Sequence, residues 1–228
     1  MTAEIFWKKR IRLVVTGVLS TSVIVCALIY ACMLLGVQKI VLAQSFHFIA
    51  SSTEHVEAGA HFVTQNGGAG YVMEDDGAQY VVFSVYLKEK EARTVQASLK
   101  DYGEETGVFV RGIDTLYVKN TDRRSIQEIK GAFSSLYGCI EVLQGEITRL
   151  DKGATQQSTK RMLTTLKGQF GYLKNAYQEK YPAFSKTCER AEMSLEQEIQ
   201  TTVFVRNLRY LQCELCVSYL DLAKEFVL

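Results

Sequence analysis

Residues 126–150 read IQEIKGAFSSLYGCIEVLQGEITRL. The apolar side chains of this stretch recur at alternating spacings of three and four residues: Ile126, Ile129, Phe133, Leu136, Ile140, Leu143, Ile147 and Leu150. Such a pattern is typical of a helix that buries one stripe against other helices. Asp122 or Thr121 can cap its start, and Lys152-Gly153 marks its end. The stretch therefore predicts a long helix that leads a C-terminal helical unit.

Two further helical segments follow within residues 122–228. The second has its own apolar stripe from Leu163 to Tyr177 and ends before Pro182. The third covers about residues 183–227, and its β-branched patch TTVFV at 201–205 could kink or split it. Helices joined by tight turns run antiparallel, so we expect a three-helix bundle. Its apolar stripes either form the bundle core alone or leave one face free for a partner or a second copy.

Residues 46–118 alternate between strand and helix patterns. Four segments are rich in the β-branched and aromatic residues of strands: FHFIAS (46–51), GYVM (70–73), QYVVFSVYL (79–87) and GVFVRG (107–112). Amphipathic stretches at 54–66 and 88–103 separate them, which gives the order β-α-β-β-α-β. Glu57-Ala58 in the first half corresponds to Glu91-Ala92 in the second, 34 residues later. A small alanine at this point lets each helix lie close to a sheet.

Two segments resemble the SPOR (sporulation-related repeat) domain family: FHFIASSTEHVEAGAHFV and QYVVFSVYLKEKEARTVQASL. The resemblance covers residues 46–118 only. It implies a bacterial, extracytoplasmic domain that is tethered by one N-terminal transmembrane helix and binds peptidoglycan glycan strands at division or sporulation septa. The family's first and third strands usually carry a polar residue, often Gln or Arg, followed by Gly and an aromatic residue. Here Phe48 and Phe83 occupy the polar positions, and Ala50 and Val85 occupy the Gly positions.

The departure from the family pattern leaves two possibilities for the sheet. Aromatic residues on an open sheet face could stack against sugar rings, and the candidates for this binding are Phe48, Tyr80 and Phe83. Alternatively, the same face could be buried against the helices that follow.

The segment Leu13–Val37 holds 25 residues without a charge. A bilayer core about 30 Å thick needs about 20 apolar residues in a helix, so this run is long enough to span it. Four basic residues precede the run, and only Lys39 follows closely. The positive-inside rule then places residues 1–12 in the cytoplasm and the bulk of the chain outside it. We expect an uncleaved, single-pass anchor at 13–37 in a bacterial cell membrane.

A cleaved signal peptide is the alternative reading of the N-terminus. Val41 and Ala43 have the small side chains of a cleavage site, and the mature chain would then begin at Gln44. The apolar run is longer than the 7–15 residues of a typical signal sequence, which favours the anchor.

Residues for catalysis or metal binding are sparse. Cys213 and Cys216 have the spacing of redox or zinc motifs, but they fall inside a helical pattern with no second CxxC motif. Outside the apolar run, the cysteines are disulfide candidates, for example between Cys139 and Cys188, with a connectivity that the sequence leaves open. The histidines at 47, 55 and 61 suggest no catalytic or zinc arrangement. We therefore expect no catalytic residue, no metal and no cofactor.

These patterns favour a non-enzymatic, membrane-anchored envelope protein of cell division or sporulation that binds peptidoglycan or a septal partner. The alternative is a structural scaffold whose C-terminal helices recruit other membrane proteins without glycan binding. A third hypothesis is an envelope redox protein that uses Cys213 and Cys216. The net charge of +1 gives no reason to expect a nucleic acid partner.

Overall fold

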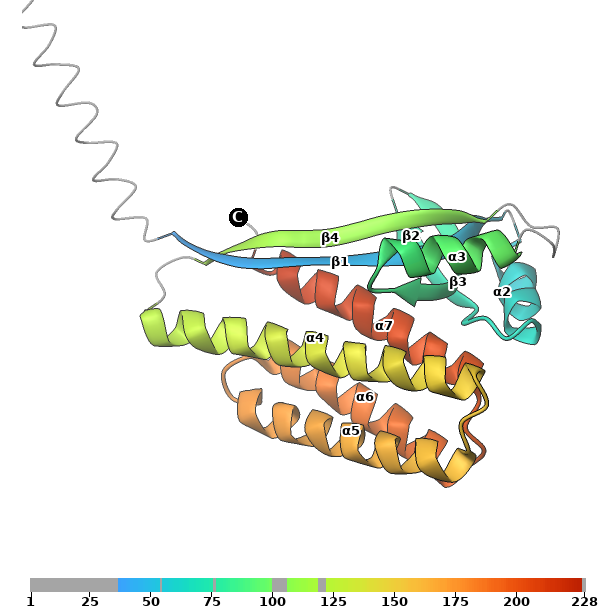
Figure 1. The fold of residues 1–228 in the computed structure, drawn as a ribbon. Helices are drawn as coiled ribbons and strands as arrows, with labels where there is room; N and C mark the ends of the chain where they lie inside the picture. The colour runs from blue at the N-terminus through green and yellow to red at the C-terminus, as the bar shows by residue number, and fades with distance from the viewer. Residues whose placement is uncertain (1–36, 54, 76, 100–105, 119–121, 227–228) are drawn as a thin grey trace, which may run out of the picture.

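The computed structural model describes residues 37–53, 55–75, 77–99, 106–118 and 122–226. They form an α+β fold with a four-stranded antiparallel sheet and six helices (Figure 1). The predicted membrane segment 13–37 lies outside the described residues except for Val37, which directly precedes the first strand. Within the described part of the chain, no helix combines the length and the apolar character that a membrane crossing needs.

The sheet contains strands β1 (Gln38–Ser52), β2 (Tyr71–Asp75), β3 (Ala78–Tyr86) and β4 (Gly107–Val118), in the spatial order β2-β3-β1-β4. Helix α2 (Val56–Gln65) follows β1, and helix α3 (Glu89–Leu99) follows β3. The order β-α-β-β-α-β is thus the one that the sequence predicts. The first strand is longer than expected, because it begins at Gln38 and not at Phe46. Its first half pairs with β4 alone.

Side chains alternate along β1 between two helical layers, as the period of two in a strand requires. Phe46, Phe48 and Ala50 belong to the large hydrophobic cluster that also contains the C-terminal helices. Ile49 points away from that cluster. It is one of four buried apolar residues outside the cluster, which come from β1, α2, β3 and α3: Ile49, Val63, Val81 and Ala92.

The C-terminal part contains four helices: α4 (Arg123–Asp151), α5 (Gln156–Tyr177), α6 (Pro182–Gln200) and α7 (Val205–Lys224). The bundle therefore has four helices where three were expected, because the third segment splits at residues 201–204, within the β-branched patch that the sequence marks as a possible break. Val203 in this break is buried. Its N–H donates to Gln156 Oε1, and its carbonyl accepts from Gln156 Nε2, both at 2.9 Å. One glutamine of α5 thus supplies the hydrogen bonds that the interrupted helix gives up.

The apolar stripe predicted for α4 is confirmed. Six of its eight residues are buried, and the terminal pair, Ile126 and Leu150, is half-buried against the core. The Ser125 N–H donates to Asp122 Oδ1 at 2.7 Å, so Asp122 is the residue that caps the start of the helix.

The sheet lies directly on the bundle. Figure 1 shows α4 and α7 between the strands and the outer pair α5 and α6. The Phe46 ring lies 5.4 Å from the Tyr219 ring of α7 and 6.1 Å from the Tyr137 ring of α4, measured between centroids. Segments 46–118 and 122–228, which we expected as separate units, therefore share one hydrophobic core.

Candidate binding surfaces

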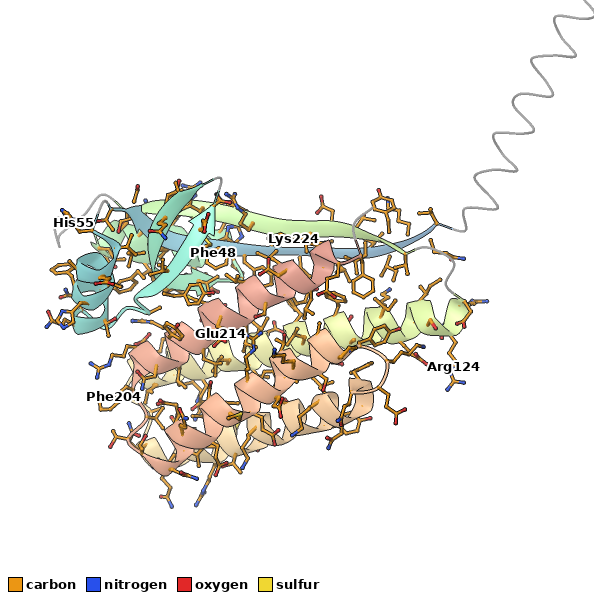
Figure 2. All side chains as sticks on the ribbon, turned by 180° about the vertical axis from the view of Figure 1, so that it is seen from behind. Phe48, His55, Arg124, Phe204, Glu214 and Lys224 are labelled. Carbon is orange, nitrogen blue, oxygen red and sulfur yellow. The ribbon has the colours of Figure 1, made fainter. Side chains whose placement is uncertain are left out.

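Two of the three predicted glycan-binding residues lie on the bundle side of the sheet. Phe48 is 0 % exposed and belongs to the shared core (Figure 2). Tyr80 is half-buried, and its ring lies 4.6 Å from that of Phe109 on β4. The prediction that Phe48 lies on an exposed, sugar-binding face is therefore wrong, because helices α4 and α7 cover this side of the sheet. The second of the two possibilities, burial against the following helices, is the one found.

Phe83 lies at a β-bulge. Ile49 pairs with Ser84 and Ala50 pairs with Val82, so Phe83 is the extra residue on β3. Its ring lines a groove of about 280 Å³ between α2, α3 and the sheet, together with Val63, Val81 and others. The guanidinium carbon of Arg209 lies 5.3 Å from the ring centroid. Phe83 thus does not share a surface with Phe48.

Arg209 and Gln144 are half-buried polar residues that were not among the predicted site residues. Arg209 on α7 donates to the Gly67 carbonyl at 2.6 Å and to Asp151 Oδ2 at 2.7 Å. Gln144 on α4 accepts from the Leu87 N–H at 3.0 Å and donates to Glu91 Oε2 at 2.7 Å. These bonds join the bundle to the segments that surround the sheet. No sequence signal identifies the two residues, because each occurs in an amphipathic helix where polar residues usually face solvent.

The disulfide prediction is wrong for the structure observed. Cys139, Cys188, Cys213 and Cys216 are all free and buried. Burial raises the pKa of the Cys139 thiol to about 11 and that of the Cys188 thiol to about 12. Burial also raises the pKa of Cys213 and Cys216. Reactive redox cysteines have the opposite shift and some exposure, so these thiols behave as small apolar core residues.

The geometry of the described residues offers no metal centre. Among them, no three His, Cys, Asp or Glu side chains lie close enough together to hold an ion. His47 is buried on β1, whereas His55 and His61 are exposed around α2.

A groove between α4 and α5, here called the α4–α5 groove, opens on the bundle side away from the sheet. It encloses about 670 Å³. Gly138 and Gly168 face open space along it, since a Cβ atom added at either position would meet nothing within 4 Å. Tyr172 is 73 % exposed beside them, and Val142 is 37 % exposed. The groove is lined by the two glycines, by the apolar side chains of Cys139, Val142, Tyr172 and Leu173, and by four polar ones: Ser135, Glu141, Thr165 and Gln169.

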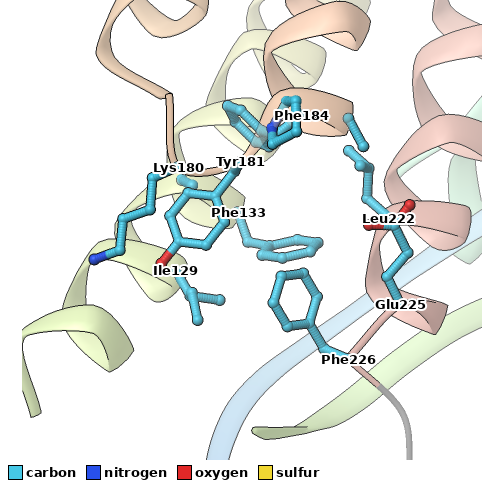
Figure 3. Close-up of a pocket in the computed structure, with 11 residues that line it drawn as sticks. Ile129, Phe133, Lys180, Tyr181, Phe184, Leu222, Glu225 and Phe226 are labelled. Carbon is cyan, nitrogen blue, oxygen red and sulfur yellow. The ribbon is translucent and has the colours of Figure 1, made fainter. Parts of the chain in front are cut away.

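A second hollow lies at the end of the bundle where α4 begins and α7 ends. This end cavity measures about 150 Å³ and is lined mainly by Ile129, Phe133, Tyr181, Phe184, Leu222 and Phe226. The Phe133 and Phe226 rings are 5.9 Å apart, and the Tyr181 and Phe226 rings are 6.5 Å apart. Figure 3 shows these rings around one space, with the amine of Lys180 pointing away from it.

No family model, no curated protein and no solved structure matches the chain. The SPOR resemblance thus stays a prediction from residues 46–118.

Proposed function

We propose that the chain is a non-enzymatic, membrane-anchored envelope protein that acts as a structural scaffold and binds protein partners through its helices. The observation that carries this proposal is the burial of Phe48 and its neighbours beneath α4 and α7. A SPOR-type sheet needs an open face for glycan binding. Here Phe46, Phe48 and Ala50 of that face are buried in the core that the sheet shares with the bundle, so these residues are not accessible to a glycan strand.

The start of β1 supports an anchor over a cleaved signal peptide. Ile40 is 2 % exposed and belongs to the shared core, and Val41 pairs with Thr115 of β4. Cleavage before Gln44 would remove both residues from the sheet. Loss of a buried isoleucine costs about 2–5 kcal/mol, so a chain that begins at Gln44 would be less stable.

The α4–α5 groove is the surface that best fits a protein partner. Tyrosine is enriched where protein interfaces concentrate their binding energy, and the exposed Tyr172 lies beside the groove. Gly138 and Gly168 allow a partner's backbone or side chain to approach both helices closely. A helix of another envelope protein that lays its apolar face into the groove is the expected mode of binding.

In-cell photocrosslinking tests this function. A photoreactive amino acid at Tyr172 should crosslink the full chain to a protein partner. The same amino acid at Met193, which is exposed on α6 away from the groove, is the matched control. Discrete protein adducts from position 172 that are absent from position 193 would support the scaffold. Equal, diffuse labelling from both positions would reject it.

Peptidoglycan binding is the second candidate, because the observed order β-α-β-β-α-β is the one expected from the SPOR resemblance. It requires the bundle to move away from Phe48. Incubation of the detergent-solubilised full chain with purified sacculi separates the two functions. We expect the chain to stay in the supernatant, and retention that free glycan strands compete away would favour the second candidate.

A further inference from the structure

The end cavity lies beside the point where the chain leaves its predicted membrane segment. Lys39, two residues after the uncharged run ends, pairs with Tyr117 of β4. The Tyr117 N–H donates to the Phe226 carbonyl at 3.1 Å, and the Phe226 ring lines the cavity. Neighbouring strands lie about 4.8 Å apart. The pairing of Lys39 with Tyr117 and the hydrogen bond from Tyr117 to Phe226 therefore connect the start of β1 to the cavity wall. If residues 13–37 span the bilayer, the cavity lies close to its outer surface.

The cavity is built for an apolar group. Apart from Lys180 and Glu225, the residues that line it are aromatic or aliphatic, and they come from α4, from residues 181–184 and from residues 222–226. Lys180 at the rim is already paired with Glu128 and also donates to Ser125 Oγ at 2.8 Å. Its amine is therefore engaged outside the cavity, and the walls select for apolar surface and not for a charged headgroup.

We propose that the end cavity receives the acyl chain of a bilayer lipid. The inference rests on the proposed membrane anchor, which brings the cavity to the lipid. Apolar protein cavities of about 150 Å³ are known to take up benzene. The end cavity has a similar volume, so it has room for about six carbons of an acyl chain. With the anchor in the bilayer, lipid chains come within reach of this end of the molecule. Their insertion would fix the folded domain against the membrane in one orientation.

Photolabelling of the reconstituted full chain tests the proposal. The vesicles contain phosphatidylcholine, phosphatidylglycerol and a small fraction of phosphatidylcholine with a diazirine in its acyl chain. After irradiation, mass spectrometry should place lipid adducts on residues 129–133, 180–184 and 222–226. Ala132→Leu fills the cavity from its wall and should lower these adducts about tenfold, because displacement of two buried methylene groups already has that effect.

Ala183→Leu is an independent filling variant at a half-buried position of the wall, useful if Ala132→Leu does not fold. Ala176→Leu on the exposed side of α5 is the matched control and should leave the adducts unchanged.

The outcomes separate the inference from the function on which it rests. A chain that stays with the vesicles after an alkaline wash but carries no adducts in the three segments would overturn the inference and leave the anchor in place. A chain that the wash releases would overturn both. A photoreactive amino acid at Glu225 on the rim reports other occupants. If it crosslinks to a second copy or to another protein instead of lipid, the proposal is also wrong.

Discussion

Phe48→Ala distinguishes a core residue from a ligand-binding surface residue. Phe48 is fully buried between β1 and the bundle, and it lies opposite Phe109 in the β1–β4 pairing. Truncation of a buried phenylalanine to alanine costs about 3–5 kcal/mol, because apolar contacts are lost and a cavity is left. In a folded body of 150–250 residues, each kcal/mol lowers the Tm by about 2–4 °C. We therefore expect the Tm of the variant to fall by about 6–20 °C.

Thermal unfolding of the full chain in mild detergent, followed by circular dichroism at 222 nm, measures this change. Val110→Thr is the matched control, since Val110 is 47 % exposed on the neighbouring strand β4 and threonine keeps the β-branched shape. The control should change the stability by less than about 0.5 kcal/mol. A Tm for Phe48→Ala that equals that of the control would refute the burial of this face.

Gly68→Ala places a Cβ atom 2.5 Å from Val63 Cγ1, so the free energy of unfolding, measured with urea, should fall by about 1–3 kcal/mol. Gly138 on α4 faces open space, so Gly138→Ala should instead raise the free energy of unfolding by about 0.5–1 kcal/mol. Because the pKa of Cys139 is about 11, iodoacetamide at pH 8 should label this thiol only after unfolding, and rapid labelling of the native protein, detected by peptide mass mapping, would contradict its burial. Hydrogen bonding from the Ser125 backbone holds the pKa of Asp122 below its ordinary value of about 3.9. The ionised Asp122 therefore contributes to the free energy of unfolding above about pH 3.9, and this contribution is lost as the pH falls through the lowered pKa. Asp122→Asn should remove this pH dependence, and urea midpoints of variant and wild type that run parallel down to about pH 2 would contradict the prediction.

Periodicity predicted the elements that local sequence determines. The stripe of α4 and the order of strands and helices in residues 46–118 follow from spacing alone, because one buried face imposes its period on the sequence. The repeat was less informative about packing. Ala92 is buried against the sheet as expected, but the corresponding Ala58 is exposed on α2.

Tertiary contacts explain what the sequence did not predict. The alternation of apolar residues at Phe46 and Phe48 would be the same if their face met sugar, solvent or a layer of helices. Only the position of α4 and α7 decides which of these the face contacts. The break between α6 and α7 depends on hydrogen bonds from Gln156, which is 47 residues away from Val203. Burial of the cysteines likewise depends on how four helices meet, so the spacing of Cys213 and Cys216 suggested chemistry that their surroundings prevent.

A double-mutant cycle between Phe46 of β1 and Tyr219 of α7 measures the contact between sheet and bundle most directly. Their rings lie 5.4 Å apart in an edge-to-face arrangement at 75°. The cycle compares Phe46→Leu, Tyr219→Leu and the double variant by urea unfolding. Coupling of about 0.5–1.5 kcal/mol between the two rings is the expected result. Additive losses within about 0.3 kcal/mol would show that the bundle does not cover this face of the sheet.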